Sequence, residues 1–152
     1  MTAWPIAELL PHAGEMILLD GVVEAGDECI ACRRRVRSEG LFEDANGLPA
    51  WAGVELMAQA VAAWAGHQAR QERQPVRLGF LLGTRHYRCD VDSFPPGTEL
   101  RVEATRSFHD DSGMAVFACH IESAIGSAEA LLNVFSPTDA EVFFTASAGE
   151  PT

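Results

Sequence analysis

One long apolar stretch constrains this chain more than any other feature. From Val54 to Ala65, ten of twelve residues are apolar, and alanine, leucine and methionine are frequent. These residues favour the helical conformation, and the pattern continues over Gly53 to Gln71. A helix that is hydrophobic around almost its whole circumference is normally buried. The sequence therefore predicts a long central helix over residues 53–71 that the rest of the chain encloses.

Two polar side chains interrupt this helix near its start. Glu55 and Gln59 are four residues apart, which places them on the same helix face. Burial disfavours a charged carboxylate, so an acid here suits the role of a proton donor. A structural interpretation stays open beside this one. In it, Gln59 is hydrogen-bonded to a neighbouring strand, and Glu55 stabilises the helix N-terminus through the helix dipole.

The length and the charge of the chain limit its class. Its 152 residues suit a single domain, with an expected core over about residues 9–136 and a tail over residues 137–152. The formal net charge of −11 argues against nucleic-acid binding, because the acidic residues would repel phosphates. No apolar run is long enough to cross a membrane, and the N-terminus lacks the pattern of a secretory signal. We therefore expect a cytoplasmic protein.

The four cysteines do not indicate a disulfide framework in a chain of this size. Cys29 and Cys32 have the CxxC spacing, but they fall in a predicted strand, where residues three apart point to opposite faces. We expect neither a metal site nor redox chemistry there, and we interpret the cysteines as small buried hydrophobic residues.

The rest of the sequence predicts a short helix and a sheet. The helix is expected over Trp4–Leu10, and the strands are expected over residues 16–25, 28–38, 78–91, 99–108, 114–124 and 128–136. Short turns join the last three strands into an antiparallel meander. A sheet with one apolar helix packs by curling around it, so the expected class is α+β. One sheet covers only part of such a helix, and we therefore expect at least a homodimer.

Arginines are concentrated in the predicted strand over residues 28–38. Arg33, Arg35 and Arg37 share one face of it, and the opposite face is apolar. The basic face is either an ordinary solvated surface or a place where something negatively charged docks.

Three motifs resemble the 3-hydroxyacyl-acyl carrier protein dehydratases, which have the hot dog fold. The family's opening motif, its central helix and a later turn are matched by Leu10–Asp20, Gly53–Ala60 and Pro96–Leu100, over roughly residues 9–135 in all. Residues 48–59 and 78–85 are similar, more narrowly, to the predicted dehydratases of aryl polyene biosynthesis clusters. The resemblance implies a hot dog fold, in which an antiparallel sheet wraps around a long central helix.

The resemblance also implies a reaction, the removal of water from a 3-hydroxyacyl thioester to give a trans-2-enoyl product. A histidine takes the proton from C2, an acid on the central helix protonates the departing hydroxyl, and a backbone N–H polarises the thioester carbonyl. By position, Glu55 is the implied acid, Gly53 offers the implied N–H, and Gln59 orients Glu55. The substrate is carried on the phosphopantetheine of an acyl carrier protein, and no other cofactor is implied.

The sequence departs from the family pattern at one important place. Typical members carry the catalytic histidine in a GHFPG segment before the central helix, whereas Asp44–Gly53 reads DANGLPAWAG. His12, in the Leu-Pro-His motif, is our candidate substitute base, with a turn or capping role as its alternative. We expect His67 at an exposed helix end. The histidines at positions 86, 109 and 120 are expected to be structural.

Two further residues are candidates for substrate contact. Trp51 either lines an acyl pocket or belongs to the core at the start of the helix. Arg85, with the other strand arginines, either contacts the phosphopantetheine phosphate or an acidic carrier protein, or is an ordinary surface charge.

Two other functions stay open at this point. A hot dog thioesterase would use Glu55 to activate water. A non-catalytic hot dog subunit would instead partner an active dehydratase, in a heteromer rather than a homodimer, because the usual histidine is absent from this chain.

Overall fold

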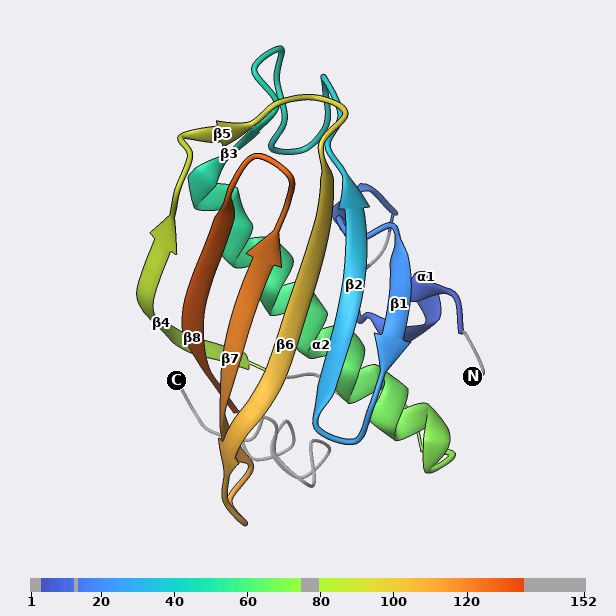
Figure 1. Cartoon of the computed structure of the whole chain (residues 1–152). Coiled ribbons are helices and arrows are strands. Elements are labelled where there is room, and N and C mark those ends of the chain that lie inside the picture. The colour runs from blue at the N-terminus through green and yellow to red at the C-terminus, as the bar shows by residue number, and fades with distance from the viewer. Residues whose placement is uncertain (1–3, 13, 75–79, 136–152) are drawn as a thin grey trace, which may run out of the picture.

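The structure, a computed structural model, describes residues 4–12, 14–74 and 80–135. The helices are α1 (Ile6–Leu9) and α2 (Gly53–Gln71), and the strands are β1 (Gly21–Ala25), β2 (Cys29–Arg35), β3 (Leu48–Pro49), β4 (Phe80–Cys89), β5 (Ser93–Phe94), β6 (Glu99–His109), β7 (Met114–Glu122) and β8 (Ser127–Phe135). Six strands form one antiparallel sheet in the order β1-β2-β6-β7-β8-β4, and β3 pairs with β5. The sheet wraps across one side of α2 (Figure 1), which confirms the predicted α+β arrangement.

Helix α2 begins and ends at the predicted residues, Gly53 and Gln71. Leu56, Met57 and Ala60 have no exposure to solvent, and the helix packs mainly against α1, β6 and β2. Burying a leucine or methionine side chain contributes about 1.5–3 kcal/mol. The apolar side chains of α2 therefore account for its place inside the sheet.

The strands alternate between a buried and a charged face. On β6, Leu100, Val102 and Ala104 point into the core, and Arg101 between them contacts Glu24 at 2.7 Å on the outer face. The meander β6-β7-β8 is present as predicted. Strand β4 pairs with β8 alone, so it forms one edge of the described sheet.

The first strand is shorter than the predicted span of residues 16–25, because β1 begins at Gly21. Side chains hold the segment before it. The Leu18 N–H donates to Gln59 Oε1 at 2.9 Å, and the Leu18 carbonyl accepts from Arg34 Nη1 at 2.7 Å. Since side chains bind both backbone groups of Leu18, neither is available to a strand ladder.

Smaller corrections concern the segments on either side of β3. Strand β2 ends at Arg35 rather than at Ser38. Residues 39–52, which lie between a predicted strand and the predicted central helix, contain β3 and a 3-10 turn, Ala50–Ala52. Likewise, the connection between the predicted strands over residues 78–91 and 99–108 supplies β5, which pairs with β3.

One arginine of β2 is buried, a feature that the alternation of exposed arginines does not reveal. Arg33, Arg35 and Arg37 are exposed as predicted, whereas Arg34 lies on the core side and is 5% exposed. It forms an ion pair with Glu43, whose other carboxylate oxygen accepts the backbone N–H of Arg37. The loop after β2 is thus fastened to the core by a paired charge.

The prediction that His67 is exposed is wrong. Its side chain is packed edge-on against Trp4, with ring centroids 5.1 Å apart, and the residue is 5% exposed. The segment around α1 covers this end of α2, and burial lowers the pKa of His67. The sequence of α2 alone does not show that another segment will cover it.

The cysteines follow the prediction in part. All four are free thiols. Cys32 and Cys119 are buried, which raises the pKa of each to about 12, but Cys29 is exposed.

No helix among the described residues is both long and apolar enough to span a membrane. The predicted tail over residues 137–152 lies outside the described residues.

Candidate active site

A histidine and a carboxyl from distant parts of the chain meet beside α2. His12 follows α1, Glu55 lies in the first turn of α2, and His12 Nε2 is 3.9 Å from Glu55 Oε1. Their side chains are 26% and 39% exposed, so both reach solvent. This separation exceeds that of a hydrogen bond, but catalytic contacts are often longer before a substrate binds. The pair therefore has the residue types and the accessibility of an acid and a base.

Gln59 connects Glu55 with the segment that follows His12. Its Nε2 donates to the Met16 carbonyl at 2.6 Å, and its Oε1 accepts from the Leu18 N–H at 2.9 Å. The same Nε2 lies 3.5 Å from Glu55 Oε1. Gln59 thus combines the two roles left open by the sequence: it hydrogen-bonds a neighbouring segment and it contacts Glu55.

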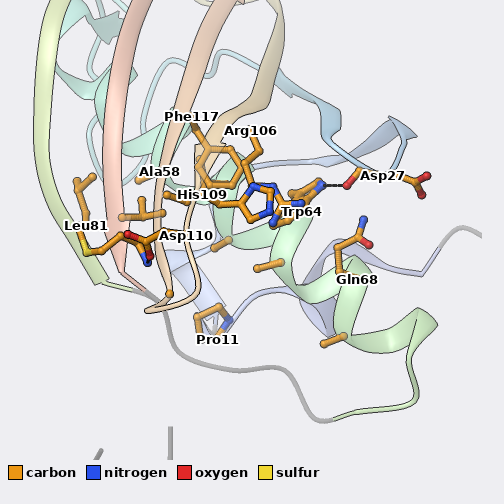
Figure 2. Close-up of a pocket in the computed structure, with 18 of the residues that line it drawn as sticks. Pro11, Asp27, Ala58, Trp64, Gln68, Leu81, Arg106, His109, Asp110 and Phe117 are labelled. Carbon is orange, nitrogen blue, oxygen red and sulfur yellow. Dashed lines mark hydrogen bonds between the residues drawn. The ribbon is translucent and has the colours of Figure 1, made fainter. Parts of the chain in front are cut away.

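His12 and Glu55 line a cavity of about 650 Å³. Its apolar lining follows α2 and the facing strands, and includes Ala58, Val61, Ala62, Ala65, Phe117 and Val134. Polar side chains, among them Gln68, Arg106, His109 and Asp110, also line the cavity (Figure 2). This volume is typical of a site for a small organic ligand, and the apolar lining suits a hydrocarbon chain.

Trp64 forms a fixed wall of the cavity. Its ring packs edge-on against Phe117 with centroids 5.3 Å apart, and its Nε1 donates to the Asp27 carbonyl at 3.2 Å (Figure 2). Arg106 lies 4.8 Å from the ring centroid, and it makes two hydrogen bonds, of 2.7 and 2.8 Å, to Glu28. These contacts hold the aromatic ring from several sides, so this wall has a defined shape.

Comparison with known families identifies the chain. Residues 4–145 match the family described as ApeP-like, ApeP dehydratase. The chain belongs to the ApeP-like dehydratase family. This confirms the family resemblance found in the sequence motifs. Comparison with curated protein sequences gives no match.

Solved structures agree with this assignment. The dehydratase heterocomplex ApeI:P from Xenorhabdus doucetiae is similar with a TM-score of 0.83 and 28% identity, over 95% of this chain and 99% of that chain. A hypothetical thioesterase with coenzyme A from Streptococcus pneumoniae has a TM-score of 0.57 and 11% identity, over 76% of this chain and 83% of that chain. The PaaI protein of Escherichia coli has a TM-score of 0.56 and 13% identity, over 76% of this chain and 80% of that chain. At these low identities the last two show the fold alone, and the hot dog fold is confirmed.

In this ApeP-like chain Gly53 is enclosed rather than open to the cavity. Its N–H donates to the Ala50 carbonyl, which also accepts the Tyr87 hydroxyl. A Cβ on Gly53 would lie 2.4 Å from the Tyr87 hydroxyl oxygen and 3.2 Å from Ile121. Glycine is therefore required here for the close packing of Tyr87, and the implied thioester donor is already hydrogen-bonded.

Trp51 and Arg85 also lie outside the lining of the cavity. Trp51 is 64% exposed and packs edge-on against Phe42, with centroids 5.4 Å apart. Arg85 is exposed on the edge strand β4 and donates to Asn133 Oδ1 at 3.2 Å. The structure thus brings together only some of the candidate residues, namely His12, Glu55 and Gln59.

The cavity lining includes residues that the sequence did not single out. Trp64 lies on α2, and Arg106 and His109 both lie on β6. The apolar character of α2 pointed to Trp64 alone, and His109 was expected to be structural. Elsewhere in the described residues, the possible metal ligands Glu103, His120 and Glu122 gather within 4.8 Å of one another. Glu103 there already contacts Arg101 at 3.6 Å, which supplies a positive charge from the protein itself.

Proposed function

We propose that this ApeP-like chain dehydrates 3-hydroxyacyl thioesters, with Glu55 as the acid and His12 as the base. The observation that carries the proposal is the 3.9 Å separation of His12 Nε2 and Glu55 Oε1 at the wall of a largely apolar cavity. A hydrocarbon chain in that cavity could leave its reacting carbons beside this histidine and this carboxyl.

The residues can divide the reaction between them. In the working form, Glu55 holds a proton and His12 Nε2 does not. His12 Nε2 removes a proton from C2, the C2–C3 double bond forms, the C3–O bond breaks, and Glu55 gives its proton to the departing hydroxyl to make water. The pair is left with the proton on His12, and its return to Glu55 across the 3.9 Å separation restores the starting state.

We propose an acyl carrier protein as the donor of the substrate, in fatty acid or aryl polyene-type biosynthesis. The membership of this chain in the ApeP-like dehydratase family supports this assignment. Phosphopantetheine then delivers the thioester, and no other cofactor takes part. Arg85 remains our candidate contact for the carrier, because it is an exposed cation on β4 in a chain with a formal net charge of −11.

We also propose a second hot dog subunit as partner, in a homodimer or in a heteromer. The similar Xenorhabdus structure is a dehydratase heterocomplex, which supports this proposal. Strand β4 supports it too, because it lies at the edge of the sheet and its Leu81 and Leu82 are 44% and 56% exposed.

A second candidate function is that of a supporting subunit without its own activity. The chain has no histidine over residues 44–53, and the Gly53 N–H is already bound, which favours a supporting subunit over an autonomous enzyme.

The deciding experiment is mass spectrometry of a 3-hydroxyacyl thioester on acyl carrier protein, incubated with wild type and with His12→Ala. Loss of one water with wild type and no loss with the variant is the expected result. If neither protein changes the substrate, while a known dehydratase does, the chain is not an autonomous dehydratase. Release of the free carrier thiol without loss of water would instead indicate hydrolysis.

A further inference from the structure

The segment that carries His12 touches α2 on both sides of that residue. After His12, the contact is Gln59, which binds the backbone of Met16 and Leu18. Before His12, residues 4–10 lie against the last turns of α2, and Leu9 has no solvent exposure. Two sets of contacts with α2, here called anchors, therefore set the position of His12. The second anchor, between residues 4–10 and the last turns of α2, has no part in the chemistry described so far.

Gly66 is the centre of the second anchor. A Cβ at this position would lie 2.0 Å from the Leu9 carbonyl oxygen and 2.8 Å from its carbon. Glycine in a helix interior costs about 1 kcal/mol relative to alanine. The close approach of the Leu9 backbone explains why glycine is present, because any side chain would push the segment away from the helix.

Two side chains on the same part of α2 complete the anchor. Arg70 donates to the Glu8 carbonyl from Nε at 3.3 Å and from Nη2 at 3.1 Å, and its guanidinium lies 3.9 Å from the Glu8 carboxylate. His67 packs edge-on against Trp4 and is buried. Backbone, charge and aromatic contacts thus hold the segment at successive points.

We propose that Gly66, His67 and Arg70 are positioning residues, which hold residues 4–10 on α2 and thereby place His12 against Glu55. The proposal rests on the proposed dehydration for its catalytic meaning, but the placement itself is a property of the free protein. Only Leu10 and Pro11 separate Leu9 from His12, so a shift of Leu9 carries His12 with it. A displacement of about 1 Å in a catalytic group can cost about 10²-fold in rate.

Kinetics give the first test, with Gly66→Ala and Arg70→Ala as the variants. The expected result is a fall in kcat of about 10-fold or more, with KM changed less than about twofold, and with Arg70→Lys retaining more activity than Arg70→Ala. Gly83→Ala is the matched control, because no atom lies within 4 Å of the added methyl group. Wild-type kcat in both folded variants would overturn the proposal.

A second test needs no turnover, so it separates this proposal from the proposed function. In the NMR spectrum of the His12 imidazole, assigned with His12→Gln, Glu55→Gln should shift the ring resonances because the groups are 3.9 Å apart. In the Gly66→Ala or Arg70→Ala background the same change should shift them at least about twofold less. An undiminished shift would overturn the positioning role. If wild type showed the coupling but no dehydration, the placement would stand and the proposed reaction would fail.

Discussion

Two carboxylates of this chain, Glu43 and Glu55, have opposite environments. The Glu43 side chain is 1% exposed, and both its oxygens are bound, one by the guanidinium of Arg34 and the other by the backbone N–H of Arg37. The Glu55 side chain is 39% exposed, and its contacts with Gln59 and His12 are long, at 3.5 and 3.9 Å. A carboxylate whose two oxygens are both bound stabilises a fold, whereas one held loosely at a cavity remains free to meet a ligand.

The largest expected effect is on stability, at Glu43. Replacing Glu43 by Ala leaves Arg34 buried without its partner, and we expect the free energy of unfolding to fall by about 3–5 kcal/mol. Urea denaturation measures this. The matched control is Glu99→Ala, whose partner Arg35 is 68% exposed, and which should cost no more than about 1 kcal/mol. Equal losses in the two variants would contradict the structural role of Glu43.

At Glu55 we expect a large effect on the reaction rate and a small one on stability. Glu55→Gln removes the exchangeable proton but keeps the size of the side chain, so the dehydration rate should fall at least about 10²-fold. The free energy of unfolding should stay within about 0.5 kcal/mol of wild type, because the carboxylate makes no short contact. Rate measurements and urea denaturation on the same preparation check both halves. Retained activity would exclude Glu55 as the acid.

Removing both partners of the buried pair is expected to cost less than removing one. The double variant Arg34→Met with Glu43→Leu leaves no unpaired charge in the core, so it should be more stable than Glu43→Ala by about 1–2 kcal/mol. The same denaturation assay applies. A double variant less stable than the single one would mean that the hydrogen bonds to the backbone, rather than the ion pair, hold the loop.

The smallest expected effect concerns His67, which is buried and whose Nδ1 has no hydrogen-bond partner among the described residues. Burial lowers its pKa in the folded protein, so the unfolded chain takes up a proton first as the pH falls. The stability associated with neutral His67 is fully present above about pH 6.5 and declines as the pH falls from there towards the folded-state pKa. His67→Phe, which keeps the ring against Trp4, should remove this decline. Urea midpoints on both sides of that pH measure it.

The sequence predicted the fold well where local composition decides the structure. Helix α2 is found at its predicted residues because its content of alanine, leucine and methionine strongly favours a helix over this stretch. The meander was predictable because its turns and its alternating strands lie close together in the chain. The first strand was misjudged because Gln59 and Arg34, both remote in sequence, bind the backbone of Leu18.

The site was predictable only in its chemistry. Family resemblance named Glu55 and His12, and their catalytic roles remain predictions, but nothing in the sequence gives the distance between them. Arg34 was overlooked because its partner Glu43 lies in a segment without periodicity, and Gly66 because its meaning depends on the path of Leu9. In each case a contact between distant segments decides the role of the residue.

The hydrogen bonds of Gln59 also have a consequence for the order of folding. They join residues 41 and 43 positions apart, and His12 and Glu55 are likewise 43 positions apart. The hairpins of β6, β7 and β8 close over much shorter loops, and closing a long loop costs entropy before its contacts offset that cost. We therefore expect the β6-β7-β8 meander to form first and the N-terminal segment to dock afterwards. During refolding, the competence to react should return later than the circular dichroism signal of the strands.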